Sequence, residues 1–387
     1  MKKAIVLVLD GAGVGELPDA EEYGDTGSDT LGNTAGAVGG LDLPCFQRLG
    51  LGNIHPIKGV LPADDPEASW GKLAEISRGK DSTTGHWEMM GLVSGVPMPT
   101  FPEGFPGAFL TEYSRLTGKT LLGNEVASGT EIIARLGEEQ MRTGGLIVYT
   151  SADSVFQVAA HEGVVPLTDL YRYCEIAREM LQPPDLGVGR VIARPFTGKP
   201  GNFTRTPDRR DFSLEPPGET LLDLFALQGI PVRGVGKIDD LFAHRNITTV
   251  HTGSNREGME TLRRMVEDPA GGFIFANFCD FDSKWGHRND FTGFAEGLKD
   301  VDRWLPSLLA ILRRGDFLFI TADHGNDPTT PSTDHSREYA PLLFYSPEMK
   351  GRPLGTRGTF ADIAGTLCDI FDVPNELPGC SFLKEAR

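Results

Sequence analysis

Paired cysteines, a surplus of basic residues and long apolar runs are all missing from this chain of 387 residues. Its five cysteines are scattered, odd in number and without C-x-x-C spacing, which argues against a disulfide framework or a zinc knuckle and favours a reducing, cytoplasmic compartment. The 54 acidic residues outnumber the 37 basic ones, and the formal net charge is −17. Such a charge repels nucleic acid and anionic membranes, so we expect neither as a partner.

The first apolar run, Ala4 to Leu9, follows two lysines and so resembles the start of a signal peptide. It stops at Asp10, which makes it too short for the core of a signal peptide or for a membrane span. We therefore interpret it as a buried strand. No internal repeat, coiled-coil heptad or low-complexity tract is evident in the sequence.

A complete dinucleotide-binding fingerprint is missing as well. The first predicted strand leads through Asp10 into Gly11, Gly13 and Gly15, but Glu16 stands where the third glycine of the fingerprint should be. The carboxylate of Asp10 would also face the pyrophosphate unless a cation lay between them. This turn therefore favours a metal-binding carboxylate over a nicotinamide site.

Length and the order of the predicted segments indicate the fold class. A chain of this size exceeds one comfortable hydrophobic core, which favours two domains. Strand-like runs alternate with helical ones, which predicts an α/β protein with a doubly wound, mostly parallel sheet. Proline-rich stretches at 96–106 and 198–217 are typical of borders where one domain is inserted into another. We expect a metal-binding catalytic core of residues 1–97 and 212–387 and an inserted, smaller α+β cap domain of residues 98–211.

Metal-competent side chains follow several predicted strands. Asp323 and His324 come after the apolar run 317–320, and Asp282 comes after the run 273–278. Ligands of open α/β sheets bind beyond the carboxyl ends of the strands. The donors collected in this way are Asp10, Asp282, His287, Asp323, His324 and His335. Six donors suffice for two divalent ions; carboxylates and imidazoles without thiolate suit Mn²⁺ or Zn²⁺, and a carboxylate-rich set favours Mn²⁺. Two ions about 4 Å apart can clamp an in-line phosphoryl transfer.

The segment 78–91, RGKDSTTGHWEMMG, offers hydroxyl groups ahead of a glycine in a predicted loop. Glycine lets the backbone approach closely at a helix start, where the amides favour an anion. Ser82, Thr83 and Thr84 are all candidate nucleophiles on spacing alone, and a helix cap followed by core residues is an equally good interpretation.

Arginines gather between residues 190 and 210 of this acidic chain: Arg190, Arg194, Arg205, Arg209 and Arg210. Guanidinium groups bind phosphate in a bidentate manner, so this local basic concentration predicts an anion site. A solvated surface explains any single arginine equally well.

The motifs resemble, in order and over nearly the whole chain, those of the phosphopentomutases, a family of the alkaline phosphatase superfamily. They are LDGAGVGE, GKDSTTGHWEMMG, TSADSVFQ, VGRVIARPF, FTRTP, VGKIDD, DFDSKWGHRND, TADHGNDP and TDHSREYAPLL. The resemblance implies an alkaline-phosphatase-like core with a cap domain. It also implies an isomerase of nucleoside salvage that interconverts ribose 1-phosphate and ribose 5-phosphate, and the 2-deoxyribose pair, through a phosphothreonine and a pentose bisphosphate. Glucose 1,6-bisphosphate or a similar sugar bisphosphate is the implied activator.

Matched motif by motif, the resemblance also implies the site residues. One Mn²⁺ is assigned to Asp10, Asp323 and His324, and a second to Asp282, His287 and His335. Thr84 becomes the phosphorylated nucleophile. The implied pentose phosphate site consists of Ser151, Asp153, Val155, Arg190, Ile192 and Lys237, to which we add Arg205 and Arg209.

Other functions share the same ligand set. A phosphomonoesterase or a cofactor-independent phosphoglycerate mutase belongs to the same superfamily, although Thr84 in place of a serine and the segment VGRVIARPF disfavour the second. A non-catalytic, metal-stabilised binding protein is a further hypothesis. It predicts that no phosphoryl group ever appears on Thr84.

Overall fold

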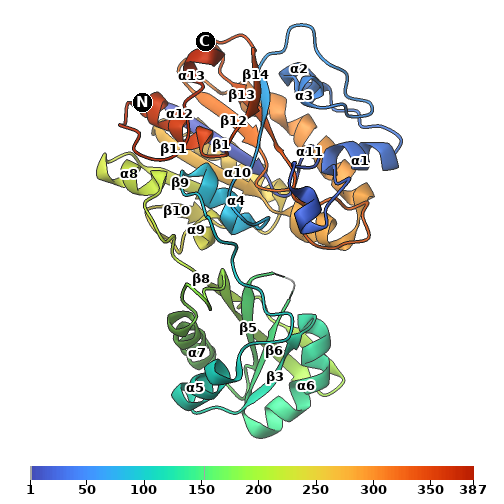
Figure 1. Ribbon diagram of the computed structural model, residues 1–387, viewed down its shortest axis with the longest axis vertical. Helices are drawn as coiled ribbons and strands as arrows, with labels where there is room; N and C mark the ends of the chain where they lie inside the picture. Colours follow the sequence, from blue (N-terminus) through green and yellow to red (C-terminus); the bar gives the residue numbers. More distant parts are fainter. Residues whose placement is uncertain (1, 152) are drawn as a thin grey trace. The chain divides into compact units, whose positions relative to one another are not determined.

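The computed structural model describes residues 2–151 and 153–387, which divide into two compact units (Figure 1). The larger unit is formed by the chain up to Val96 and from Pro216 onward, and the smaller unit by Pro97–Glu215. From the sequence, this second border was predicted after Asp211. It lies after Glu215 because strand β8 (Arg210–Ser213) pairs with β6 (Arg190–Lys199) and so completes the sheet of the smaller unit.

Among the described residues, eight strands form the sheet of the larger unit in the order β10-β9-β11-β1-β12-β13-β2-β14. Neighbouring strands are parallel, except that β13 runs antiparallel to both β12 and β2. The strands are β1 (Lys3–Leu9), β2 (Ser69–Leu73), β9 (Val232–Val235), β10 (Thr248–Val250), β11 (Gly272–Phe278), β12 (Phe317–Thr321), β13 (Ala340–Tyr345) and β14 (Pro353–Arg357).

The three central strands are buried along their whole length. β1 reads KAIVLVL and β11 reads GFIFANF, and every residue of both strands is buried. A continuous apolar run of this kind is typical of a parallel strand that helices cover on both faces. The register pairs Leu9 with Phe278 and Val8 with Thr321, so the carboxyl ends of β1, β11 and β12 lie side by side.

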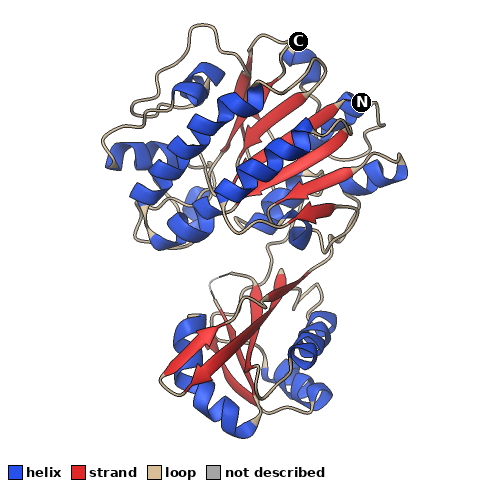
Figure 2. Ribbon diagram, turned by 180° about the vertical axis from the view of Figure 1, so that it is seen from behind, coloured by secondary structure: helices blue, strands red, loops and turns tan. Residues whose placement is uncertain are grey.

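Helices cover both faces of this sheet. α10 (Asn255–Glu267) and α11 (Phe291–Leu309) lie against one face, and α4 (Ser82–Met89) and α12 (Asp362–Phe371) lie against the other (Figures 1 and 2). The other helical segments of this unit are η1 (Ala20–Tyr23), α1 (Thr30–Ala37), α2 (Pro44–Leu49), α3 (Leu51–Ile54), α8 (Leu221–Leu227), α9 (Ile238–Leu241), η2 (Phe281–Trp285), η3 (Gly286–Arg288) and α13 (Leu383–Ala386). None of the helices in the described residues combines the length and apolar character that a membrane span requires.

The smaller unit has a mixed sheet of its own with the order β3-β4-β5-β6-β7, and β8 pairs with β6. The strands not yet introduced are β3 (Leu121–Val126), β4 (Leu146–Thr150), β5 (Val155–His161) and β7 (Asn202–Arg205). The helices are α5 (Gly107–Thr117), α6 (Gly129–Thr143) and α7 (Leu167–Met180).

Alternation along β4 explains how this sheet buries both faces. Leu146 and Val148 pack in the core formed with α5 and α7, whereas Ile147 and Tyr149 pack in the core formed with α6. Successive side chains of a strand point to opposite faces, so one strand contributes to two cores. The predicted fold class, an α/β protein with a doubly wound, mostly parallel sheet and a smaller inserted unit, is confirmed.

Candidate metal centre

The six predicted ligands converge at the carboxyl ends of the three central strands. Asp10 directly follows β1, Asp282 lies in the short helical segment after β11, and Asp323 comes just after β12. His335 is further along the chain, but a bridge between Gly325 and Ser336 folds its loop back onto the segment that follows β12. The parallel register of the strands therefore builds the centre from distant segments.

The first predicted triad is compact. The Nε2 atom of His324 lies 3.4 Å from Asp10 Oδ1 and 3.3 Å from Asp323 Oδ2. All three side chains are buried. Two ligands of one tetrahedral ion with bonds of about 2.1 Å stand about 3.4 Å apart, so these atoms are spaced as ligands of a shared cation.

The second predicted triad is centred on Asp282. Its Oδ1 atom lies 3.1 Å from His335 Nε2, and its Oδ2 atom lies 3.3 Å from His287 Nε2. Burial alone raises the pKa of Asp282, but the imidazoles of His335 and His287 outweigh burial and hold the pKa well below its usual range. Ligand atoms of Asp282, Asp10 and His324 also lie within 4.8 Å of one another. The two triads are therefore contiguous, with Asp282 next to both.

Unpartnered polar atoms show that these residues fit a cation. Asp10 Oδ1, Asp323 Oδ2 and His335 Nε2 are buried and, within the part of the chain that the structure describes, make no hydrogen bond of good geometry, although each faces another predicted ligand at 3.1–3.4 Å. A buried polar atom left without a partner costs about 1–3 kcal/mol. One divalent ion at each triad would satisfy these atoms: the first ion would bind Asp10 Oδ1 and Asp323 Oδ2, and the second would bind His335 Nε2.

A neutral donor holds one oxygen of each of the three carboxylates. Asn277 Nδ2 donates to Asp10 Oδ2 over 2.8 Å, and Asn326 Nδ2 donates to Asp282 Oδ1 over 2.7 Å. The amide of Gly11 donates to Asp323 Oδ1 over 3.0 Å. Such partners orient a ligand and leave its other oxygen for the ion. Neither asparagine was predicted from the sequence; the polar Asn277 inside the apolar strand β11 was the available signal.

Charge in the centre is balanced by histidine. Burial and then the charges of Asp323 and Asp282 raise the pKa of Asp10. Burial also raises the pKa of Asp323, but the imidazoles of His324 and His86 outweigh burial and lower this pKa to about 2. Burial would lower the pKa of His324, yet Asp323 and Asp10 raise it well above its usual value. A proton and a metal ion therefore compete for His324.

Helix α4 lies directly against this centre. A Cβ at Gly85 would fall 2.9 Å from the carbonyl carbon of Asp323 and closer still to its oxygen, so only glycine fits there. Ser82 Oγ is 3.0 Å from His324 Nε2, and His86 Nδ1 is 3.2 Å from Asp323 Oδ2. The residues expected in a loop instead form the first turns of α4. Sequence reasoning gave no role to His86, which is fully buried.

Thr84, the predicted nucleophile, is buried in the first turn of α4. Asp81 caps this helix. Its Oδ1 accepts from the Thr84 amide over 3.0 Å, and its Oδ2 accepts from Thr84 Oγ1 over 2.6 Å. Thr84 is thus hydrogen-bonded to Asp81, whereas the hydroxyl in contact with a predicted ligand is that of Ser82.

Five predicted substrate residues lie at one end of the sheet in the smaller unit: Ser151, Asp153, Val155, Arg190 and Ile192. The first two lie between β4 and β5, and the others belong to the paired strands β5 and β6. Arg190 Nη2 is 3.8 Å from Asp153 Oδ2. Lys237 belongs to the larger unit, where it precedes α9 after the carboxyl end of β9.

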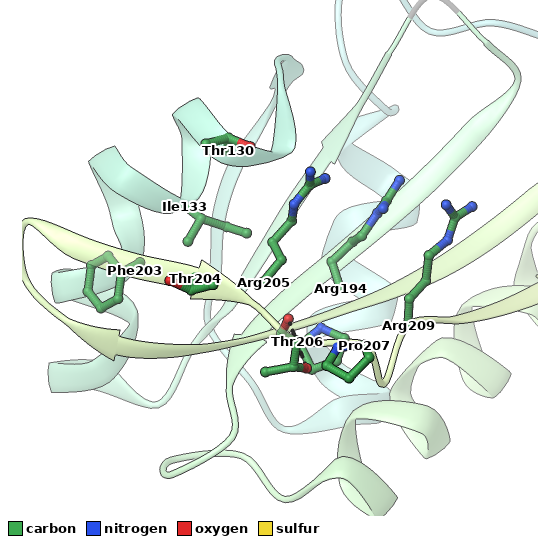
Figure 3. A pocket seen from close by; sticks show the side chains of 10 residues that line it. Thr130, Ile133, Arg194, Phe203, Thr204, Arg205, Thr206, Pro207 and Arg209 are labelled. Carbon is green, nitrogen blue, oxygen red and sulfur yellow. Dashed lines mark hydrogen bonds between the residues drawn. The ribbon is translucent and has the colours of Figure 1, made fainter. Parts of the chain in front are cut away.

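A pocket of about 500 Å³ in the smaller unit is lined by Arg194, Arg205 and Arg209. Figure 3 shows their side chains extending side by side in the same direction. Burial and then the charge of Arg209 lower the pKa of Arg194 to about 10. Arg209 pairs with Asp211 through two hydrogen bonds, of 2.6 and 2.5 Å. The pocket therefore contains two predicted residues and adds Arg194, which the sequence analysis left out of the substrate site.

Comparisons with known proteins define first the class of the chain and then its family. The family model described as the metalloenzyme superfamily matches residues 239–375, a segment that includes five of the six predicted ligands. A solved structure, the PH0037 protein from Pyrococcus horikoshii, aligns with a TM-score of 0.50 over 98% of this chain and 99% of its own, at 14% identity, and so supports the fold.

Relatives of much higher identity supply the family. The phosphopentomutase of Caldanaerobacter subterraneus subsp. tengcongensis is 55% identical over 387 residues, which cover 100% of this chain and 98% of that protein. The phosphopentomutase of Dictyoglomus thermophilum is 56% identical over 386 residues, covering 99% and 98%. The chain therefore belongs to the phosphopentomutase family, as the motifs predicted, and it is an isomerase of the mutase type.

Proposed function

We propose that the chain interconverts ribose 1-phosphate and ribose 5-phosphate, and likewise the 2-deoxyribose pair. The observation that carries this proposal is the meeting of six metal-competent side chains with the N-terminus of α4, which contains Thr84. With its family, we assign the chain to nucleoside salvage in the cytoplasm. Glucose 1,6-bisphosphate or a similar sugar bisphosphate is proposed as the activator.

We assign Asp10, Asp323 and His324 to one Mn²⁺ and Asp282, His287 and His335 to the other. The pairwise separations of 3.1–3.4 Å support this assignment, as does the lack of thiolates among the ligands. When bound, the ions would neutralise charge on the non-bridging oxygens of the phosphoryl group that is transferred. Asn277 and Asn326 keep two of the carboxylates oriented for this task.

The proposed chemical step moves a phosphoryl group between Thr84 and the sugar. The P–O bond to Thr84 Oγ1 breaks while a P–O bond to a sugar hydroxyl forms, and the proton of that hydroxyl is passed to Thr84 Oγ1. The resulting pentose bisphosphate turns around and returns its other phosphoryl group by the reverse step. The short hydrogen bond between Thr84 Oγ1 and Asp81 Oδ2 provides a place for the proton of the free threonine. The amides at the start of α4 favour the phosphoryl anion.

We propose that the sugar phosphate is held by Ser151, Asp153, Val155, Arg190, Ile192 and Lys237, with Arg205 and Arg209 as further phosphate ligands. The pocket lined by Arg205 and Arg209 supports the last two assignments, because guanidinium pairs bind phosphate oxygens in a bidentate manner. Arg194 lines the same pocket and is added to this group.

An intact-mass measurement tests the nucleophile. After incubation with glucose 1,6-bisphosphate and Mn²⁺, the parent chain is expected to gain one phosphoryl mass and Thr84→Ala to gain none. Ser82→Ala is the matched control, because it removes the neighbouring hydroxyl that contacts His324 and should still become phosphorylated. Loss of the added mass in Ser82→Ala with retention in Thr84→Ala would transfer the role to Ser82.

Product analysis tests the reaction. Ribose 5-phosphate incubated with the loaded chain should yield ribose 1-phosphate. Stoichiometric release of inorganic phosphate instead would identify a phosphomonoesterase and would contradict the proposed phosphoryl transfer between Thr84 and the sugar.

A further inference from the structure

A second group of metal-competent side chains lies at the edge of the larger sheet, apart from the six ligands described above. We propose that Asp239, Asp240 and His251 bind one additional divalent transition-metal ion of the Zn²⁺ type, with His244 holding the carboxylate of Asp239 in place. Binding at this site does not depend on the proposed reaction.

The topology of the sheet brings these residues together. β9 and β10 are parallel neighbours, and Val235 pairs with Val250 at their carboxyl ends. Asp239 and Asp240 lie in α9, which begins shortly after β9, while His251 directly follows β10. Segments that leave adjacent parallel strands at the same end meet there, which is the arrangement that also builds the main centre.

The donor atoms are close enough to share an ion. Ligand atoms of Asp239, Asp240 and His251 all lie within 4.8 Å of one another. His251 Nε2 is 2.7 Å from Asp239 Oδ1, and His244 Nδ1 is 2.9 Å from Asp239 Oδ2. The second nitrogen of His244 is 3.9 Å from Asp240 Oδ1. Two carboxylates and an imidazole, without thiolate, form a ligand set suited to Zn²⁺, and a water can complete a tetrahedron.

The backbone turn that supplies His244 is unfavourable by itself. Ala243 and His244 have φ angles of 50° and 61°, in the left-handed region that residues other than glycine avoid. Backbone strain of this kind persists only where the surroundings require it. Here the turn folds the His244 amide back onto the Asp239 carbonyl, over 2.8 Å, and so brings the imidazole to the Asp239 carboxylate. A hydrogen-bonded ligand carboxylate of this kind is typical of metal sites.

Access and spacing are compatible with an incoming ion. The side chain of His251 is 51% exposed and that of Asp240 is 20% exposed, so the group opens to solvent on one side. Two ligands of one tetrahedral ion stand about 3.4 Å apart. The distance between His251 Nε2 and Asp239 Oδ1 must therefore increase slightly to admit the ion, and the exposed imidazole is free to move. Two ordinary histidine–aspartate hydrogen bonds are the competing explanation.

Helix α9 links this group to the proposed reaction. Lys237 immediately precedes α9, and the carbonyl of Leu241 accepts a 2.8 Å hydrogen bond from Trp87 Nε1 of α4. An ion held by Asp239 would therefore stiffen the segment between a proposed substrate lysine and the helix that contains Thr84. This coupling, unlike ion binding itself, rests on the proposed function.

Metal content measured by mass spectrometry tests the site. The full chain is loaded with Zn²⁺, freed of excess ion by gel filtration and compared with His251→Gln and Asp240→Asn. Both variants are expected to retain one ion fewer per chain than the parent. His55→Gln is the matched control. The Nε2 atom of His55 makes an equally short bond of 2.7 Å to Asp29 Oδ2, but among the residues that the structure describes no second carboxylate joins that pair in a metal-competent group. It should retain the parent content.

Equal metal content in the parent and in both variants would overturn the proposal and leave the hydrogen-bond explanation. Thermal melts accompany each measurement and confirm that the variants fold; the rise in Tm on addition of Zn²⁺ should be smaller in both variants than in His55→Gln. The failure of this metal-site proposal can be distinguished from the failure of the proposed reaction, because Thr84→Ala should leave the Zn²⁺ content of this site unchanged.

Discussion

Replacement of Gly85 by alanine gives the sharpest test of how α4 and the metal centre fit together. Gly85 lies between Thr84 and His86, and its Cα faces the backbone of Asp323. An added Cβ would stand 2.9 Å from the carbonyl carbon and 3.2 Å from the Cα of Asp323, and nearer still to the carbonyl oxygen. These are backbone atoms at the end of a buried strand, so α4 has to move rather than its neighbour.

Two effects of this substitution compete. Alanine is a better helix former than glycine by about 1 kcal/mol, which alone would stabilise α4. Overpacking in a close-packed interior costs about 1–3 kcal/mol. Because the added Cβ would overlap the Asp323 backbone, we expect this cost to outweigh the gain in helix propensity. A displacement of about 1 Å between reacting groups lowers a rate on the order of 100-fold, equivalent to about 2.7 kcal/mol of barrier.

The assay compares kcat/KM for conversion of ribose 5-phosphate, together with Mn²⁺ content and Tm. Gly85→Ala should stay folded and lose about 100-fold in kcat/KM. Gly36→Ala is the matched control, since Gly36 also lies in a helix but an added Cβ meets nothing within 4 Å. Activity of Gly85→Ala within twofold of the parent would refute the close fit between α4 and the Asp323 backbone.

Three further outcomes follow from buried groups. Asn277→Val removes the donor to Asp10 and should weaken Mn²⁺ binding about 10- to 100-fold in a metal titration. Arg337→Met leaves Glu75 buried without its 2.6 Å partner and should lower the free energy of unfolding by about 3–5 kcal/mol in a urea titration. Burial raises the pKa of Glu338 from 4.5 to about 8, so the folded chain keeps a proton that the unfolded chain releases. The stability that Glu338 contributes is therefore complete below pH 4.5 and is lost as the pH rises to about 8. Glu338→Gln should flatten this fall in metal-free protein, and an unchanged pH profile would contradict the assignment.

The sequence was informative where a buried strand ends in a polar side chain. Asp10 and Asp323 each follow a continuous apolar run, and parallel strands place their carboxyl ends at one edge of a sheet. That reasoning predicts which donors share a site without knowledge of the strand order. His335 was predicted through its motif, but its approach depends on the bridge between Gly325 and Ser336, a contact that strand patterns do not encode.

The surroundings of the ligands were not predictable in the same way. Asn277 and Asn326 act on carboxylates that are remote in the sequence, and His86 reaches Asp323 only because α4 packs against that strand. The segment before Gly85 was expected to be a loop, since glycine and short hydroxyl residues weaken a helix pattern. The cap from Asp81 and the contact with the Asp323 backbone make it helical instead.

The sequence by itself determined the class of fold, the family and the identity of the metal-competent donors, because these follow from local patterns of burial and from motifs along the chain. Only the tertiary structure decided which donors lie next to each other. Asp282, for example, lies close to Asp10 and His324 as well as to His287 and His335, and the hydroxyl that contacts His324 is that of Ser82. It alone revealed the group around Asp239, whose members belong to no common motif. Distances between remote segments arise from strand register and helix packing, and these are set by the whole core rather than by any one stretch of residues.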